Sequence, residues 1–217
     1  MNIAIDGPSG SGKSTIAKIL AKKLNIAYLD TGAMYRGIGY FVLKNGIMPD
    51  DETSIIEILD KITMEIEDKD GVQQVIVNGE NVTAFIREHN ISMAASTVSK
   101  IPAVRLKLVD LQRKIAQKSD CVLDGRDIGS YVLPNAEYKF YLTANSLVRA
   151  QRRQKELAEK GQILTVDEIR KDIEARDLQD QTRSFCPLTI CSDATLIDTS
   201  CMSIEEVTDT VMKIICK

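Results

Sequence analysis

Residues 7–14 read Gly-Pro-Ser-Gly-Ser-Gly-Lys-Ser, which fits the pattern Gly-x-x-x-x-Gly-Lys-Ser at every fixed position. The short apolar stretch Asn2–Asp6 precedes this loop, and from Lys13 onward apolar residues recur at helical spacing. A strand before the loop and a helix after it form the context in which this pattern binds nucleotide phosphates. A chance match to a glycine-rich turn is therefore disfavoured, and we predict a nucleotide-binding loop.

The chemistry of the loop follows from its residue types. Glycines let successive backbone N–H groups point at an anion, and the helix that begins at Lys13 adds the positive end of its dipole. Lys13 places a charge on the β- and γ-phosphates, and the Ser14 hydroxyl is a ligand for Mg²⁺. We expect ATP to bind to the loop residues Gly7, Pro8, Ser9, Gly10, Ser11, Gly12, Lys13, Ser14 and Thr15.

Strand-like and helix-like segments alternate along most of the chain. Short apolar segments that begin at residues 2, 27, 121, 138 and 194 predict five strands of one parallel sheet flanked by helices. Two charged helices are predicted at 145–160 and 166–181, and Ser203 with Glu206 predicts a capping box at a last helix. We therefore predict an α/β chain with the P-loop NTPase fold and a single domain over residues 1–217.

The region between the second and third of these strands follows a different pattern. Residues 64–67 and 72–77 alternate between apolar and polar types on either side of Asp70-Gly71. Two such runs around a short turn predict a β-hairpin. We interpret residues from about 60 to about 95 as a small subdomain inserted into the α/β domain.

Composition excludes several classes of protein. With 44% hydrophobic and 27% charged residues, the chain has the composition of a globular domain, not of a disordered one. It has no apolar run of about 18 residues and no basic, apolar leader, so we expect neither a membrane span nor a signal peptide. The 28 basic and 31 acidic residues argue against binding nucleic acid by bulk charge. We expect a cytoplasmic protein without a nucleic-acid or membrane partner.

Cysteine and histidine content argues against a disulfide framework, a zinc site and a histidine-dependent nucleophile. The five cysteines form no Cys-x-x-Cys pair, and we expect reduced thiols. His89, the single histidine, lies in a polar stretch and is expected at the surface, the alternative being a catalytic base.

The phosphate loop does not by itself select a reaction. GTPases usually carry an Asn-Lys-x-Asp motif, which this sequence lacks. ATPases usually show an apolar strand that ends in Asp-Glu, whereas Cys121–Asp124 continues into Gly125. These features favour phosphoryl transfer to a small acceptor. An acceptor that is itself a phosphate needs several arginines to neutralise two crowded anions, and it needs no strong general base.

Arginines occur in settings that suit this task. Arg126 and Asp127 follow the third core strand, and ligands of α/β folds bind at the carboxyl ends of strands. Arg176, Asp180 and Arg183 share one helix face at spacings of four and three, although spacing alone favours a solvated salt-bridge ladder. The neighbouring residues Arg152 and Arg153 diverge by about 100° around a helix and need not share a target.

The chain closely resembles the bacterial cytidylate kinases, a family of nucleoside monophosphate kinases, along almost its whole length. The most specific matches are Asp30-Thr31-Gly32-Ala33-Met34-Tyr35-Arg36 and Asp124-Gly125-Arg126-Asp127. The resemblance implies Mg²⁺-dependent transfer of the ATP γ-phosphoryl group to CMP and dCMP, giving CDP or dCDP and ADP. It also implies that CMP lies between the core and the inserted, NMP-binding subdomain, and that residues from about 150 to about 165 form a closing helical lid. We expect a monomer.

The resemblance also assigns roles to single residues. Ser96, Arg105 and Asp127 would read cytosine, because a carboxylate and a hydroxyl accept from its amine while the O4 of uracil would be repelled. Arg176 and Asp180 would bind the ribose. The acceptor pocket would also include Thr31, Tyr35, Arg36, Arg126 and Arg183, with the arginines clamping the phosphate. Arg152 and Arg153 would reach the donor phosphates from the lid. The implied catalytic residues are Lys13, Arg126, Arg152 and Arg183.

Two alternatives belong to different classes. Another small-acceptor enzyme, such as a UMP/CMP, adenylate or shikimate kinase, would share the loop but phosphorylate a different acceptor. A nucleotide-gated binding module would use ATP only as a switch and would show no acceptor-stimulated release of ADP.

Overall fold

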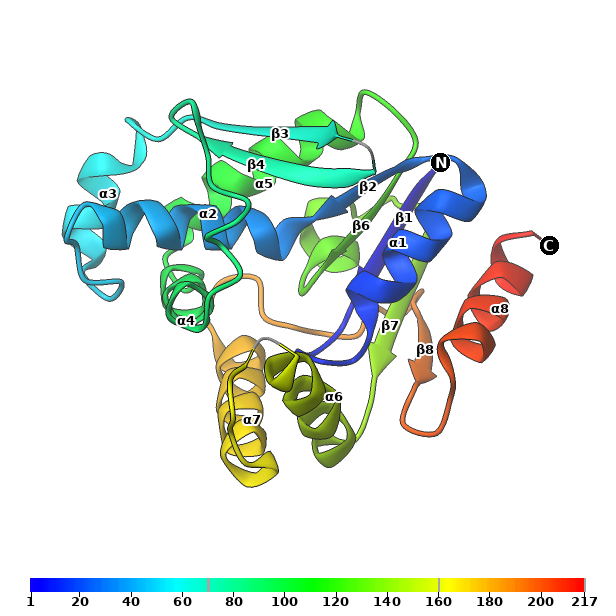
Figure 1. Cartoon of the computed structure of the whole chain (residues 1–217). Helices are drawn as coiled ribbons and strands as arrows, with labels where there is room; N and C mark the ends of the chain where they lie inside the picture. The colour runs from blue at the N-terminus through cyan, green and yellow to red at the C-terminus, as the bar shows by residue number, and fades with distance from the viewer. Residues whose placement is uncertain (70, 160, 217) are drawn as a thin grey trace. The chain divides into compact units, whose positions relative to one another are not determined.

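Five strands form the main sheet in the computed structural model, which describes residues 1–69, 71–159 and 161–216 (Figure 1). Their order is β2-β6-β1-β7-β8, and β1 lies parallel to both β6 and β7. This arrangement confirms the predicted parallel sheet. The strands are β1 (Asn2–Asp6), β2 (Ala27–Asp30), β6 (Cys121–Gly125), β7 (Tyr138–Thr143) and β8 (Thr195–Asp198).

The chain divides into two compact units. Unit 1 contains Met1–Tyr28 and Ser119–Lys217, and unit 2 contains Leu29–Lys118. The range from about 60 to about 95, predicted as a subdomain from its hairpin pattern, falls within the residues of unit 2. Its role as an NMP-binding subdomain remains a prediction.

The core of unit 1 lies between the main sheet and two helices, α1 (Lys13–Leu24) and α8 (Ile204–Ile215). Apolar side chains of β1 and β7 pack with those of both helices, including Ile16, Leu20 and Val211. The predicted capping box is present, because Ser203 accepts the N–H of Glu206 and Glu206 accepts the N–H of Ser203. This packing fixes the start of α1, and with it the end of the phosphate loop.

Two further helices of unit 1 pack side by side, α6 (Ser146–Ala158) and α7 (Val166–Thr182) (Figure 1). They correspond to the two predicted charged helices. Their shared apolar cluster contains Ala150, Leu157, Ile169 and Ile173. Residue 160, which falls within the predicted lid, lies outside the described residues, and the lid remains a prediction.

A short π-helix, η1 (Ile128–Val132), follows β6 and was not predicted.

Unit 2 contains a three-stranded antiparallel sheet and four helices among its described residues. The predicted hairpin is confirmed, with Met64 opposite Val77 and Lys69 opposite Val72. Asp70, in the predicted turn, lies outside the described residues. The elements are α2 (Thr31–Lys44), α3 (Glu52–Leu59), β3 (Met64–Lys69), β4 (Val72–Val77), β5 (Glu80–Asn81), α4 (His89–Val98) and α5 (Pro102–Ala116).

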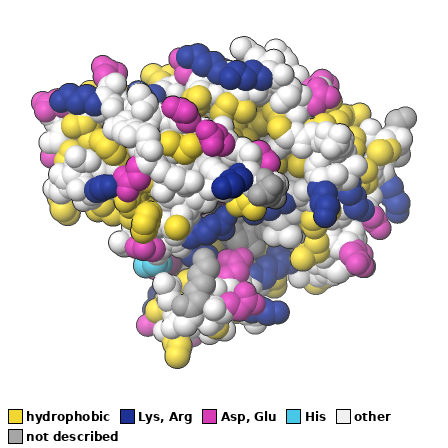
Figure 2. All heavy atoms as spheres, turned by 45° about the horizontal axis from the view of Figure 1, so that its top comes forward, with side chains coloured by type: hydrophobic (Ala, Val, Ile, Leu, Met, Phe, Trp, Pro, Cys, Tyr) yellow, Lys and Arg dark blue, Asp and Glu magenta, His cyan; other side chains and the backbone are white. Residues whose placement is uncertain are grey.

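The surface carries charges of both signs. On the face drawn in Figure 2, the Lys and Arg side chains are interspersed with Asp and Glu. His89 is exposed, as predicted. All five cysteines are free, and no helix of the described chain is long and apolar enough to cross a bilayer.

Candidate active site

The phosphate loop connects β1 to α1 in a conformation that depends on glycine. Gly7 has a φ of 144°, and a Cβ added there would lie 2.0 Å from the backbone oxygen of Leu142 on β7. Gly10 and Gly12 also have positive φ, at 76° and 93°. Residues with a side chain rarely adopt these φ angles, so the conformation of the loop requires glycine at these three positions.

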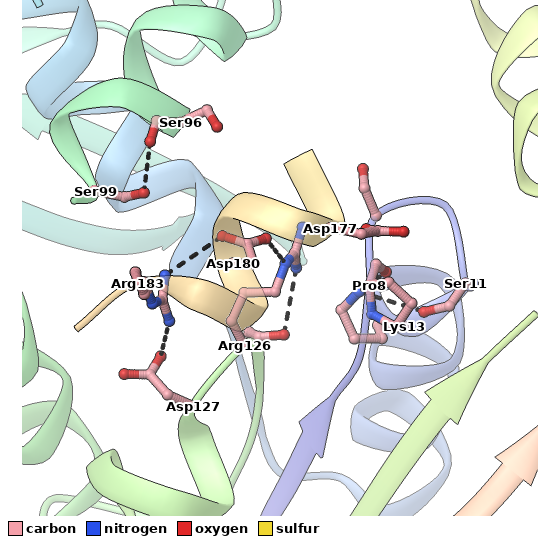
Figure 3. A network of polar contacts seen from close by, with 12 residues as sticks. Pro8, Ser11, Lys13, Ser96, Ser99, Arg126, Asp127, Asp177, Asp180 and Arg183 are labelled. Atoms are coloured by element: carbon pink, nitrogen blue, oxygen red, sulfur yellow. Dashed lines mark hydrogen bonds and ion pairs between the residues drawn. The ribbon is translucent and has the colours of Figure 1, made fainter. Parts of the chain in front are cut away.

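Lys13 lies folded back into this loop (Figure 3). Its ammonium donates to the Pro8 carbonyl at 2.6 Å and to the Ser11 hydroxyl at 3.3 Å, and only 5% of the residue is exposed. Burial, together with the nearby positive charge of Arg126, lowers the pKa of Lys13 to about 7. A bound anion has the opposite effect on such a group, because it stabilises the charged form. The loop therefore holds a lysine whose charge is best stabilised when phosphates are present.

The hydroxyl of Ser14 donates to the carboxylate of Asp124 at 2.7 Å. Asp124 lies near the end of β6, is 4% exposed, and also accepts from the Tyr28 hydroxyl at 2.8 Å. A hydroxyl and a carboxylate are the oxygen ligands that phosphate-loop proteins offer to Mg²⁺, which completes its shell with phosphates and waters. The pair therefore fits a magnesium site. Asp124 was not among the predicted site residues, although an apolar strand that ends in an acid is a signal for it.

Four predicted acceptor residues come together in unit 1 (Figure 3). The Nε of Arg126 donates to Asp180 at 2.9 Å, and Arg183 approaches the other oxygen of Asp180 at 3.4 Å. Arg183 also lies 3.9 Å from an oxygen of Asp127. Burial alone lowers the pKa of Arg126, but the Asp180 carboxylate raises it above its ordinary value. The result is a chain of alternating charges, of which Arg126, with a side chain 23% exposed, is half-buried.

This burial argues against the solvated salt-bridge ladder near the end of α7, and the roles of these residues in binding CMP remain predictions. The side chains of Arg183 and Asp180 are 5% and 11% exposed, which is far from a solvated ladder. Arg183 is held further by a 2.6 Å hydrogen bond from its Nε to the Cys186 carbonyl. Arg176, also predicted, is partly buried on α7.

In unit 2, the start of α2 holds another predicted arginine. Asp30 caps the helix by accepting the N–H of Ala33 at 2.8 Å, and its second oxygen accepts from Arg36 at 2.9 Å. Burial pushes the pKa of Asp30 upward, but the charge of Arg36 and the helix N–H outweigh it and hold that pKa below its usual range. Thr31, which follows Asp30 as the first residue of α2, is also buried.

The predicted base-reading residues of unit 2 are linked through the connection between α4 and α5. Arg105 is 1% exposed, and it donates to the Ser99 carbonyl at 3.1 Å. The Ser99 hydroxyl in turn donates to the Ser96 carbonyl at 2.8 Å. The guanidinium of Arg105 also lies 5.3 Å from the ring centre of Tyr35, a cation–π contact. Tyr35, Ser96 and Arg105 are thus fixed relative to one another.

The two predicted lid arginines have different partners. Arg152 donates to the hydroxyl of Thr199 at 3.0 Å and to its carbonyl at 2.6 Å. The hydroxyl of Thr199 in turn donates to the Ser11 carbonyl at 3.1 Å, so Thr199 links Arg152 to the phosphate loop. Arg153 instead pairs with Glu156 of its own helix at 3.0 Å. The divergence expected from their adjacent positions is confirmed, while direct contact with donor phosphates stays a prediction.

Arg149, which was not predicted as a site residue, connects the phosphate loop to α7. It donates to the Ser9 carbonyl at 3.0 Å and pairs with Asp177 at 2.6 Å. Its side chain is 7% exposed. The sequence signal for a role of Arg149 is its place on α6, one helical turn before Arg153. Because its partner in the loop is a carbonyl, this contact holds the loop backbone without using a loop N–H group.

Comparison with known sequences gives one consistent family. The family model described as cytidylate kinase matches residues 3–217. The cytidylate kinase of Caldicellulosiruptor bescii is 48% identical over 217 residues, which cover 100% of this chain and 96% of that protein. The cytidylate kinase of Halalkalibacterium halodurans is 47% identical over 212 residues, covering 98% and 96%.

Solved structures share the fold at low sequence identity. An uncharacterized protein from Eubacterium ventriosum has a TM-score of 0.53 at 14% identity, covering 100% of this chain and 99% of that one. Shikimate kinase from Bacteroides thetaiotaomicron has a TM-score of 0.50 at 13% identity, with the same coverage. The family itself follows from the sequence matches over the full length: the chain belongs to the cytidylate kinase family.

Proposed function

We infer that the chain catalyses transfer of the γ-phosphoryl group of ATP to CMP, giving CDP and ADP, as part of pyrimidine nucleotide metabolism. The observation that carries this function is the match to cytidylate kinases at 48% identity over the whole chain. The phosphate loop and the buried arginine cluster supply the chemistry that such a transfer requires. We propose that dCMP is also a substrate.

On the donor side, the loop N–H groups and Lys13 bind and orient the triphosphate. The Lys13 charge faces the phosphates on which negative charge develops during transfer. We propose that Ser14 and Asp124 hold Mg²⁺, which neutralises charge on the donor phosphates when it is bound. Arg149 and Thr199 hold the loop backbone by donating hydrogen bonds to the carbonyls of Ser9 and Ser11.

On the acceptor side, we propose that Arg36, Arg126 and Arg183 hold the CMP phosphate. A phosphate oxygen that attacks in line is already an anion, so the transfer needs positioning and positive charge more than a general base. The exposed position of His89, the single histidine, agrees with this requirement. Thr31 and Tyr35 complete the proposed CMP set, and Arg152 is proposed to reach the donor phosphates.

For the nucleoside, we propose that Asp127 and Ser96 accept from the cytosine amine and that Arg105 donates to N3 or O2. Uracil presents an acceptor where cytosine has the amine, so a carboxylate there discriminates against UMP. Arg176 and Asp180 are proposed to bind the ribose. The burial of Asp127 and Arg105, at 4% and 1% exposed, supports these roles because buried groups discriminate most strongly.

A substrate panel tests the function directly. ADP release is measured in a coupled assay with CMP, dCMP, UMP, AMP and shikimate as acceptors. We expect CMP and dCMP to be phosphorylated with a kcat/KM at least tenfold above that of UMP. Equal turnover of UMP or AMP would remove the base-reading assignment. ADP release that no acceptor stimulates would favour the nucleotide-gated binding module.

We also propose that the enzyme acts as a cytoplasmic monomer. Its substrates, ATP and CMP, are nucleotides of the cytoplasmic pool. Light scattering on the purified protein gives the mass in solution, and 24.1 kDa is the value expected for a single chain. A mass of twice that value would contradict the monomer.

A further inference from the structure

Asp6 connects two segments that are far apart in the sequence. It is the last residue of β1, directly before the phosphate loop. One carboxylate oxygen accepts the backbone N–H of Ile128 at 2.8 Å, and the other accepts that of Gly129 at 2.7 Å. Both hydrogen bonds are buried, and Asp6 is 5% exposed. These two N–H groups open η1, immediately after Arg126 and Asp127.

Two hydrogen bonds to consecutive N–H groups fix both the position and the orientation of that backbone. Asp127 itself has φ −145° and ψ 27°, which belongs to neither a helix nor a strand. Regular structure therefore does not determine where its side chain lies. The Asp127 carbonyl accepts the N–H groups of Tyr131 and Val132, and the segment is fixed on either side by the register that places Gly125 opposite Asp6 and by the two hydrogen bonds to Asp6 itself.

Gly129 allows the backbone to approach Asp6. A Cβ added at this position would lie 3.1 Å from the Cδ of Lys139 and 3.4 Å from a carboxylate oxygen of Asp6. A Cβ alone would press mainly on the Lys139 side chain and would reach ordinary contact distance from Asp6, so a side chain larger than a methyl group is needed to push the segment away from the carboxylate. The close approach is thus built from both partners, the acid on β1 and the glycine on η1.

A buried, ionised carboxylate at this position lowers the stability of the folded protein. Burial raises the pKa of Asp6 to about 6, even though the two N–H bonds and the charge of Lys13 act in the opposite direction. Groups that are kept against such an unfavourable term are concentrated at functional sites.

We propose that Asp6 is a positioning residue that sets Arg126 and Asp127 relative to the phosphate loop. The inference rests on the proposed function, in which Asp127 reads cytosine and Arg126 binds the acceptor phosphate. One carboxylate then places the residues that select the acceptor against the loop that holds the donor. A change at Asp6 alters the choice and affinity of the acceptor more than the affinity for ATP.

Asp6→Asn is the matched test, because it keeps the shape of the side chain. The amide oxygen accepts one N–H, and the amide nitrogen faces the other, so one of the two bonds is lost. We expect the KM for CMP to rise by about tenfold and the preference for CMP over UMP in kcat/KM to fall by a similar factor, since loss of a hydrogen bond to a charged group has about this effect. The Kd for ATP, from calorimetry without acceptor, should change less than threefold.

Asp51→Asn is the control, because Asp51 also accepts a backbone N–H, that of Ser54 at 3.1 Å, but is exposed and caps α3. Gly129→Val is a second route to the same effect, because its branched side chain extends beyond the Cβ position toward Asp6, and it leaves the Asp6 carboxylate in place. We expect it to lower the CMP preference as well, and this variant keeps the proposal testable if Asp6→Asn fails to fold.

The outcomes are distinguishable. If the unsubstituted chain does not phosphorylate CMP, the proposed function fails. If it does, and folded Asp6→Asn and Gly129→Val keep the CMP preference and the KM for CMP, the role of Asp6 is overturned while the function stands. An equal loss on every acceptor and on ATP binding would indicate a structural role only and would also overturn the proposal.

Discussion

The hydroxyl of Ser14 donates a 2.7 Å hydrogen bond to Asp124, and this contact joins the start of α1 to the end of β6. It places a hydroxyl and a carboxylate together beside the phosphate loop. The pair is therefore the part of the site best suited to a divalent ion that also binds donor phosphates.

Substitution of Asp124 should change the metal requirement. For Asp124→Asn we expect the Mg²⁺ concentration that gives half-maximal activity to rise by about 10–100-fold, the range typical for lost metal-site partners. Activity is measured against total Mg²⁺ at fixed ATP. Tyr28→Phe removes the other hydrogen bond to Asp124 and keeps the carboxylate, so its Mg²⁺ requirement should stay close to that of the unsubstituted chain. An unchanged requirement in Asp124→Asn would exclude Asp124 from the metal site.

Substitution of Lys13 should abolish turnover and spare the fold. Lys13→Ala removes the side chain that faces the transferring phosphoryl group, and we expect kcat to fall by at least about 100-fold. Thermal unfolding should show a Tm no lower than that of the unsubstituted chain, because a buried lysine is unfavourable for stability. Lys18→Ala, on the exposed side of the same helix, serves as the control and should keep full activity. Substantial turnover by Lys13→Ala would contradict its role.

ATP binding should take up protons above neutral pH. In the free protein the pKa of Lys13 is lowered to about 7 by burial, so at pH 8 most molecules carry a neutral Lys13. Bound phosphates stabilise the charged form, so binding raises this pKa and draws a proton from the buffer. Calorimetric titration with ATP at pH 8 in two buffers of different ionisation enthalpy measures the uptake. We expect a value approaching one proton per ATP, and affinity that falls from pH 7 to pH 9. Zero uptake would show that Lys13 is already charged in the free protein.

Asp127 should determine the choice of base. For Asp127→Asn we expect the KM for CMP to rise by about 10–100-fold, equivalent to about 1.5–3 kcal/mol for a hydrogen bond to a charged group. UMP should be affected less, because its O4 no longer meets a carboxylate. Asp172→Asn, an exposed position on α7, is the control. The ratio of kcat/KM for CMP and UMP is the measurement, and an unchanged ratio would remove Asp127 from base recognition.

Asp6 should make its own contribution to the pH dependence of stability. Its pKa is raised from 3.8 to about 6 in the folded protein, so between these values the folded state binds more protons than the unfolded state. Stability from this group therefore declines as pH rises through about 6. Relative to the unsubstituted chain, Asp6→Asn should gain about 1.4 kcal/mol of unfolding free energy between pH 5 and pH 8. Urea denaturation at both pH values measures this difference, and a constant difference would contradict the raised pKa.

Local patterns in the sequence predict most of the fold. The segments that begin at residues 2, 27, 121 and 138 are strands, the fifth begins at Thr195, and the alternating runs around residue 70 form the hairpin. These elements depend on short-range periodicity and on turn residues. The phosphate loop is predictable for the same reason, because its strand, glycines and helix are contiguous.

Contacts across the sheet are not visible in the sequence. Asp124 meets Ser14 only because β6 lies beside β1, and no local pattern encodes that neighbourhood. The π-helix η1 is fixed by hydrogen bonds to Asp6, more than 120 residues earlier. The hydrogen bond between Arg126 and Asp180 likewise joins residues that are far apart in the sequence. Spacing along α7 gave only a shared face, and the structure supplies the partner.

Each of the arginines proposed to hold the acceptor phosphate already has a carboxylate partner in this structure. Arg36 pairs with Asp30, Arg126 pairs with Asp180, and Arg183 lies close to both Asp180 and Asp127. If these arginines hold the acceptor phosphate as we propose, the phosphate must share or replace the carboxylate partner of each one. A simple inorganic anion has only its charge to offer in this exchange. A nucleotide would add the proposed contacts of its base and sugar, so we expect these arginines to bind whole nucleotides in preference to free inorganic phosphate.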